Sequence, residues 1–80
     1  MWDKSKSKGE NRVRISFNVT GDKVVDEIKL KSAELINLIE SLQLPADFPE
    51  PGEFMRLKAQ AQTEIESGAA WAVKAATAHL

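Results

Sequence analysis

Residues 44–52 read LPADFPEPG, and all three prolines of the chain fall within this stretch. Proline lacks a backbone N–H and disfavours a helical conformation in the residue before it, so Pro45 ends any preceding helix. Pro51 suits the first position of a following helix. The stretch therefore predicts a connection between two helices, over about 22–42 and from about 51 to near the C-terminus. We expect them to fold back as an antiparallel hairpin whose second arm overhangs the first.

The first expected helix carries a wide apolar stripe, and Thr20 or Asp22 is expected to cap its first turn. Residues at helical spacing fall on one face, and further apolar residues beside them widen it. The stripe consists of Val25, Ile28, Leu35, Ile39 and Leu42, widened by Val24, Ile36 and Leu38. This is wider than the seam that a single partner helix requires.

The second half of the second helix is unusual, because residues 68–76 (GAAWAVKAA) are small and apolar nearly all round. A helix of this kind is buried on several sides, which two helices of one chain cannot provide. A chain of 80 residues also has a marginal core unless something reinforces it. Without cysteine for disulfides, oligomerisation is the reinforcement that remains. We therefore predict a mainly α protein that assembles as a helical oligomer.

The N-terminal part differs from the rest in charge and pattern. Residues 1–14 carry five basic and two acidic side chains, a net charge of +3, whereas the other 66 residues have a net charge of −4. Residues 1–11 (MWDKSKSKGEN) are predicted to be a disordered basic tail. Residues 12–19 (RVRISFNV) alternate with a period of two, which predicts a short extended arm. The domain for oligomerisation and ligand binding is then 12–80.

Several function classes are not expected from this composition. The chain has no cysteine nucleophile, P-loop or GxGxxG motif, and its one histidine, His79, is next to the C-terminus. We therefore predict no enzymatic activity, no metal site and no cofactor. No apolar run of about 18 residues and no signal-peptide core is present, so no membrane association is expected.

A few residues depart from their local pattern and are candidate ligand contacts. Lys74 is either a lysine whose stem lies along the surface or a cation for an anionic ligand. Trp71 either fills an interface or offers a stacking surface to a flat ligand. Alternation places Phe17 toward the core and Asn18 toward solvent, while Arg56 is either solvated or a bidentate phosphate ligand.

Two segments carry a resemblance to a known family. These are RISFNVTGDKVVDEIKLKSAELI (14–36) and RLKAQAQTEIESGAAWAVKAAT (56–77). Over roughly 12–78 the chain resembles the phage-encoded anti-CBASS and anti-Thoeris cyclic-nucleotide sponges. The most specific features are FN followed by a glycine turn and VDEIK, and a tryptophan followed by AVKAAT.

The resemblance implies a fold and a function. Members have two long antiparallel helices after a short N-terminal element, and assemble as trimers that pair into a homohexamer. They bind cyclic dinucleotides, and in some cases cyclic trinucleotides or cyclic ADP-ribose isomers, without cleaving them. They thereby suppress anti-phage defence in the cytoplasm of the infected bacterial host.

The resemblance also implies roles for particular residues. Phe17 would stack on a base, Lys29 in VDEIK would meet a phosphate, and Lys74 would be the basic residue late in the second helix. The further implied contacts are Asn18, Arg56 and Thr77. The chain has no tyrosine, and Lys74 stands where some members carry arginine.

An alternative from a different class is a small helical structural or regulatory protein that binds a partner through its basic tail. The partner would be a protein or a nucleic acid, of which nucleic acid is the less expected. The sponge hypothesis is favoured because a ligand with two phosphates and two bases needs two cations and two stacking surfaces. A symmetric assembly supplies these by bringing together Phe17, Lys29 and Lys74 from several copies.

Overall fold

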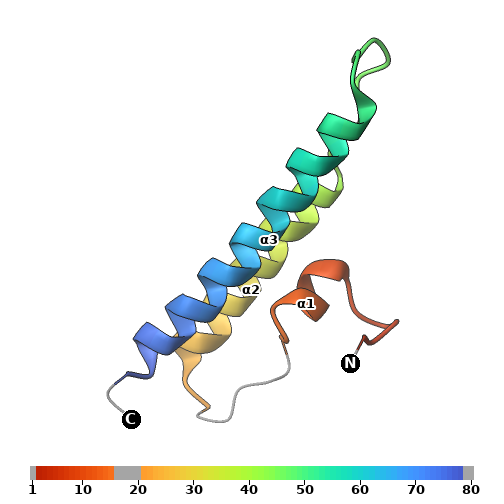
Figure 1. Ribbon diagram of the computed structural model, residues 1–80. Coiled ribbons are helices and arrows are strands. Elements are labelled where there is room, and N and C mark those ends of the chain that lie inside the picture. Colours follow the sequence, from red (N-terminus) through yellow and green to blue (C-terminus); the bar gives the residue numbers. More distant parts are fainter. Residues whose placement is uncertain (1, 16–20, 79–80) are drawn as a thin grey trace.

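The computed structural model describes residues 2–15 and 21–78 (Figure 1). They form three helices, α1 (Lys8–Arg12), α2 (Lys23–Glu40) and α3 (Pro51–Ala76), and the described part contains no strand. The two long helices lie side by side and antiparallel, and α1 packs against the middle of this hairpin (Figure 1). The prediction of a mainly α protein with an antiparallel hairpin is confirmed.

The ends of the hairpin helices follow from local chemistry. Asp22 is the N-cap of α2, and its Oδ1 accepts a hydrogen bond from the Val24 N–H at 2.8 Å. Thr20, the other predicted cap, lies outside the described residues. Helix α2 ends at Glu40, two residues before the predicted end, and Pro51 occupies the first turn of α3 as expected. With 26 residues against 18, α3 overhangs α2.

The N-terminal segment is a correction to the sequence-based prediction. Residues 2–11 were expected to be disordered and 12–15 to be extended, but Lys8–Arg12 form α1. A capping box starts this helix, because the Ser7 hydroxyl accepts from the Glu10 N–H and the Glu10 carboxylate accepts from the Ser7 N–H. Helix α1 therefore crosses the predicted boundary between residues 11 and 12. Residues 16–19 lie outside the described part.

A Schellman motif ends α1 and accounts for the turn found at residues 13–15, where the expected extended arm would begin. The Ile15 N–H bonds to the Glu10 carbonyl at 3.0 Å, and the Arg14 N–H bonds to the Asn11 carbonyl at 3.2 Å. Arg14 takes the left-handed position of this motif, with φ of 54°. The alternation of apolar and polar residues that suggested a strand instead places Val13 and Ile15 against the hairpin.

The core lies where the three helices meet. Val13, Ala33, Ile36 and Ala69 are buried together, with Ile36 fully inaccessible. Only part of the predicted apolar stripe of α2 is covered within one chain, since Val25 is buried but Leu35 and Leu42 are 44% and 51% exposed. The reason is that α1 and α3 pack on the Val25–Lys29–Ala33–Ile36 face of α2, which lies beside the predicted stripe.

Candidate functional site

A pocket of about 460 Å³ lies where the end of α1 meets α2 and the second half of α3. Four basic side chains, one carboxylate and several small apolar side chains line it. These residues are Arg12, Val13, Arg14, Lys29, Glu66, Ala69, Ala70, Val73 and Lys74. All three helices or their ends therefore contribute to one concave surface.

The end of α1 brings two arginines into this pocket. Val13, the C-cap of α1, is buried in the core with Ala33, Ile36 and Ala69. Because Arg12 and Arg14 flank this anchored valine in sequence, both are held at the pocket wall. Packing of one apolar side chain thus fixes the position of two cations.

Lys29 is a buried cation at the centre of the site. Its side chain on α2 is only 7% exposed, and its Nζ donates to the backbone carbonyl of Arg14 at 3.1 Å. Burial lowers the pKa of the Lys29 ammonium below its ordinary value of 10.5, the Asp26 carboxylate opposes this shift, and the Arg14 cation adds to it. An ammonium held this way interacts strongly with any anion that enters the pocket.

Arg12 and Glu66 join α1 to α3 across the pocket. Arg12 Nε donates to Glu66 Oε1 at 2.7 Å, and the Arg12 Nη2 donates to the Thr63 hydroxyl at 3.3 Å. Glu66 carries the one carboxylate among the lining residues. Its bond to Arg12 competes with a ligand for the guanidinium group. The pocket retains a surplus of three positive charges.

The far wall of the pocket is the C-terminal part of α3. Lys74 Nζ lies over the Trp71 ring, 4.6 Å from its centroid, in a cation–π contact. Trp71 itself is 65% exposed and does not line the pocket, but its ring is beside a residue that does. The Thr77 hydroxyl donates to the Val73 carbonyl at 2.8 Å, so this predicted ligand residue takes part in the C-terminal turn of α3.

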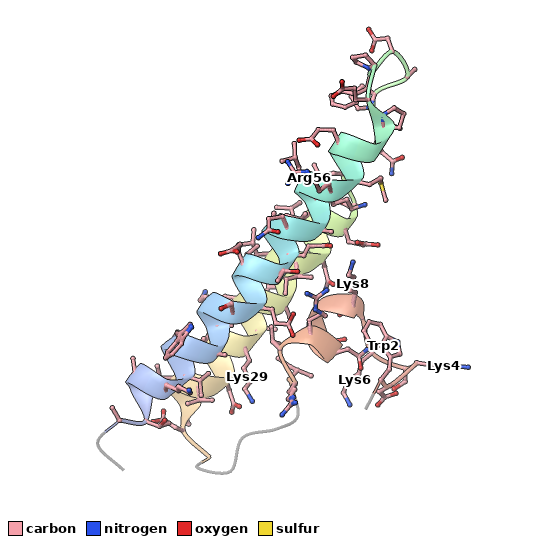
Figure 2. All side chains as sticks on the ribbon, in the orientation of Figure 1. Trp2, Lys4, Lys6, Lys8, Lys29 and Arg56 are labelled. Carbon is pink, nitrogen blue, oxygen red and sulfur yellow. The ribbon has the colours of Figure 1, made fainter. Side chains whose placement is uncertain are left out.

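The structure brings together only some of the residues that the sequence singled out. Lys29 and Lys74 line the same pocket, as the resemblance implied for residues at one site. Arg56 is near the connection, remote from Lys29 (Figure 2), and its guanidinium forms a bidentate pair with Glu53 at 3.0 and 2.6 Å. Phe17 and Asn18 lie outside the described residues.

Arg12, Arg14 and Glu66 were not predicted as site residues from the sequence. The two arginines were assigned to the polar face of a strand, although the Ser7-x-x-Glu10 capping box upstream indicates a helix that ends near them. Nothing in the local pattern of Glu66 marks it as the partner of an arginine 54 residues away.

Lys6 and Lys8 of the predicted tail (Figure 2) both form ion pairs, and Lys8 reaches the two long helices. Lys6 pairs with Asp3 at 3.0 Å. Lys8 Nζ donates to Glu40 Oε1 at 3.0 Å and to Gln62 Oε1 at 2.8 Å, which links α1 to both long helices. The basic segment is therefore part of the domain surface, and this disfavours the hypothesis of a free arm that recruits a partner.

The described residues limit the chemistry of the site. They contain no group of three or more histidine, cysteine, aspartate or glutamate side chains placed to hold a metal ion. Within residues 2–15 and 21–78, no helix has the length and apolarity to cross a bilayer. What the pocket offers is cationic groups for phosphates beside apolar walls for flat rings.

The chain was compared with known proteins. A family model described as Acb2/Tad1, hairpin domain, matches residues 8–77. The match begins at the first residue of α1 and ends at the C-cap of α3, so it covers all three helices. No match was found among curated proteins or among solved structures.

Proposed function

The chain belongs to the Acb2/Tad1 hairpin-domain family, and from this membership we propose that it binds cyclic oligonucleotide second messengers and holds them uncleaved. The resemblance found in the sequence is confirmed by the family match. Membership implies a sponge role, in which the protein lowers the concentration of a free messenger. A protein with this role needs a tight site and no catalytic group.

The observation that carries the proposal is the convergence of Arg12, Arg14, Lys29 and Lys74 on one pocket with alanine and valine walls. A cyclic dinucleotide presents two phosphates and two bases. Arginine guanidinium groups bind phosphate through two parallel hydrogen bonds, and lysine contributes a point charge. Ala69, Ala70 and Val73 offer the apolar surface on which a base can lie.

We propose further that the protein works as an oligomer, a homohexamer built from two trimers. Support comes from large apolar side chains left exposed on the single chain, among them Leu38 at 64% and Trp71 at 65%. Large apolar side chains that a single small chain leaves exposed are candidates for contact between copies. An assembly also supplies additional cations and aromatic rings to ligands larger than the pocket of one chain.

The proposed biological setting is the cytoplasm of an infected bacterial host. There the protein would bind the messengers that the host's anti-phage immune enzymes produce, and the defence response would stay below its threshold. Cyclic dinucleotides are the first candidates, followed by cyclic trinucleotides and cyclic ADP-ribose isomers.

Native mass spectrometry with a mixed panel of these nucleotides tests the proposal. We expect an oligomer that retains a cyclic nucleotide of unchanged mass, and intact nucleotide after the complex is heated. Lys74→Ala should reduce retention, whereas Lys4→Ala is the matched control because Lys4 points away from the hairpin (Figure 2). An oligomer or monomer that retains no nucleotide, or a linearised product, would contradict the proposal.

A further inference from the structure

Helix α1 is fastened to α2 by a small set of contacts that lie away from the pocket. The Asn37 Oδ1 accepts a hydrogen bond from the Gly9 N–H at 2.8 Å, and the Asn37 Nδ2 donates to the Ser7 hydroxyl at 3.0 Å. One amide side chain on α2 thus satisfies two polar groups in the first turn of α1. We call Ser7, Gly9 and Asn37 the α1 clasp.

The clasp depends on the absence of a side chain at position 9. A Cβ built on Gly9 would lie 2.1 Å from the backbone oxygen of Ala33 and 2.8 Å from its Cα. Both atoms belong to the main chain of α2, so rotation of a side chain cannot relieve the clash. Any other residue at this position requires α1 to move away from α2.

The clasp and the pocket lie at opposite ends of the same short helix. Gly9 is in the first turn of α1, and Arg12 is its last residue, followed by the buried Val13 and by Arg14. Since α1 has only five residues, a displacement at its start is transmitted to its end. The Arg12–Glu66 bond and the Lys29–Arg14 bond are the contacts that such a displacement breaks.

We infer that Gly9 and Asn37 are positioning residues of the pocket, which hold α1 against α2 so that Arg12 and Arg14 face the ligand. This inference rests on the proposed function for the ligand it names, an anionic cyclic nucleotide. Neither residue lines the pocket. They act through the two arginines, and the fit of α1 on α2 is therefore part of the binding site.

The test compares three variants by calorimetric titration with a cyclic dinucleotide that the wild-type protein binds. Gly9→Ala and Asn37→Ala should each weaken binding by about tenfold or more, because correct placement of two charge-assisted contacts is lost. Gly52→Ala is the matched control, since a Cβ there meets nothing within 4 Å. It should bind as the wild type does, and circular dichroism should show the hairpin helices in all three.

A double-mutant cycle separates positioning from general destabilisation. In a background of Arg12→Ala with Arg14→Gly, the further change Gly9→Ala should alter the dissociation constant by less than about twofold, because the groups it positions are gone. An equal loss of affinity in both backgrounds would overturn the inference.

A second measurement needs no ligand, and so distinguishes failure of this inference from failure of the proposed function. In ¹⁵N-labelled protein the Arg12 Nε–H, which donates to Glu66, should give a protected resonance that Arg12→Lys removes. Gly9→Ala should abolish this protection and Gly52→Ala should keep it. If the wild type binds no cyclic nucleotide, the proposed function fails and this resonance alone decides whether Gly9 positions Arg12. Unchanged protection in Gly9→Ala would overturn the inference.

Discussion

The Lys29 ammonium on α2 bonds to the backbone carbonyl of Arg14 at 3.1 Å, so the turn after α1 is held by a buried cation. Arg14 has a left-handed backbone with φ of 54°, a conformation that glycine adopts at far lower cost. A strained arginine and a desolvated lysine therefore share one contact at the pocket. Strain and desolvation of this kind are frequent at functional sites.

Replacing Arg14 by glycine should distinguish the contribution of its charge to ligand binding from its contribution to the stability of the fold. Arg14→Gly removes a cation from the pocket and relieves the positive-φ strain, while the carbonyl that Lys29 uses remains. We expect affinity for a cyclic dinucleotide to fall by about tenfold, and the free energy of unfolding to stay within about 1 kcal/mol of the wild type. Calorimetric titration and urea unfolding measure the two quantities. A large loss of stability would mean that the Arg14 side chain has a structural role.

As pH rises, ligand binding should begin to weaken at a lower pH than it would if Lys29 had the pKa of an ordinary lysine. Burial lowers the Lys29 pKa below 10.5, and only the protonated amine attracts a phosphate. The dissociation constant should therefore begin to rise as pH increases through this lowered pKa. Lys29→Met should weaken binding at neutral pH and move the onset of the alkaline loss to higher pH. Identical pH profiles for the two proteins would show that Lys29 does not contact the ligand.

Deprotonation of Lys29 should have the opposite effect on the stability of the free protein. Between the lowered folded pKa and the unfolded value of 10.5, the unfolded chain binds a proton at Lys29 that the folded chain does not. The free energy of unfolding should thus rise with pH through this window in the wild type relative to Lys29→Met. Urea unfolding at a series of alkaline pH values measures this difference.

The hairpin was predictable because its signals are local. Pro45 lies within the connection, Pro51 begins α3, and Asp22, one of the two predicted caps, begins α2. The face of α2 that is buried was not predictable in the same way. Ile36 and Lys29 are covered because α1 and α3 both pack on their face of α2, and these tertiary contacts override the stripe predicted from α2 alone.

The site was only half predictable for a related reason. Lys29 was identified through the family resemblance and Lys74 first through its place in an apolar segment, and both line the pocket. Arg12 and Arg14 were missed because the alternating pattern of 12–19 is compatible with a strand as well as with the end of a short helix. Period-two alternation over these eight residues does not distinguish the two structures, whereas the capping box at Ser7 does.

Neutralising Glu66 should strengthen binding. A ligand phosphate must compete with the Glu66 carboxylate for the Arg12 guanidinium, since Nε already donates to it at 2.7 Å. Glu66→Gln keeps the size of the side chain and removes one negative charge from the pocket. Because the pair is partly exposed, we expect a gain of up to about fivefold in affinity, largest at low salt.

A matched control for this change is Glu64→Gln, because Glu64 is an exposed residue on α3 that does not line the pocket. Titrations of both variants at two salt concentrations measure the effect. Weaker binding by Glu66→Gln would indicate that the carboxylate instead holds Arg12 in the productive position.

Acid should release α1 before it unfolds the hairpin. Bonds from Ser7 lower the pKa of Glu10, and bonds from Gln62 and then Lys8 lower the pKa of Glu40. Both carboxylates therefore stabilise the fold above their unfolded value of 4.5, and this stabilisation is lost as pH falls through the lowered folded values. Hydrogen exchange of the α1 amides should accelerate there while far-ultraviolet circular dichroism still shows α2 and α3. Simultaneous loss of both signals would show that α1 and the hairpin open as one unit.

Trp71 offers a direct probe of the surface that the single chain leaves open. Its ring is 65% exposed and has the Lys74 ammonium over it, and the residues on either side of it in the sequence, Ala70 and Ala72, are small. Coverage by a second copy of the chain moves the ring from water to an apolar contact. In a Trp2→Phe background, the fluorescence emission of Trp71 should therefore shift to shorter wavelength as protein concentration rises, without ligand.

Quenching that appears only on adding a cyclic nucleotide, with no dependence on protein concentration, would instead assign the ring to base stacking. An emission maximum that responds to neither would leave the exposed ring without a role in assembly or binding, and the proposed oligomer would then have to use the Leu35 and Leu38 side of α2.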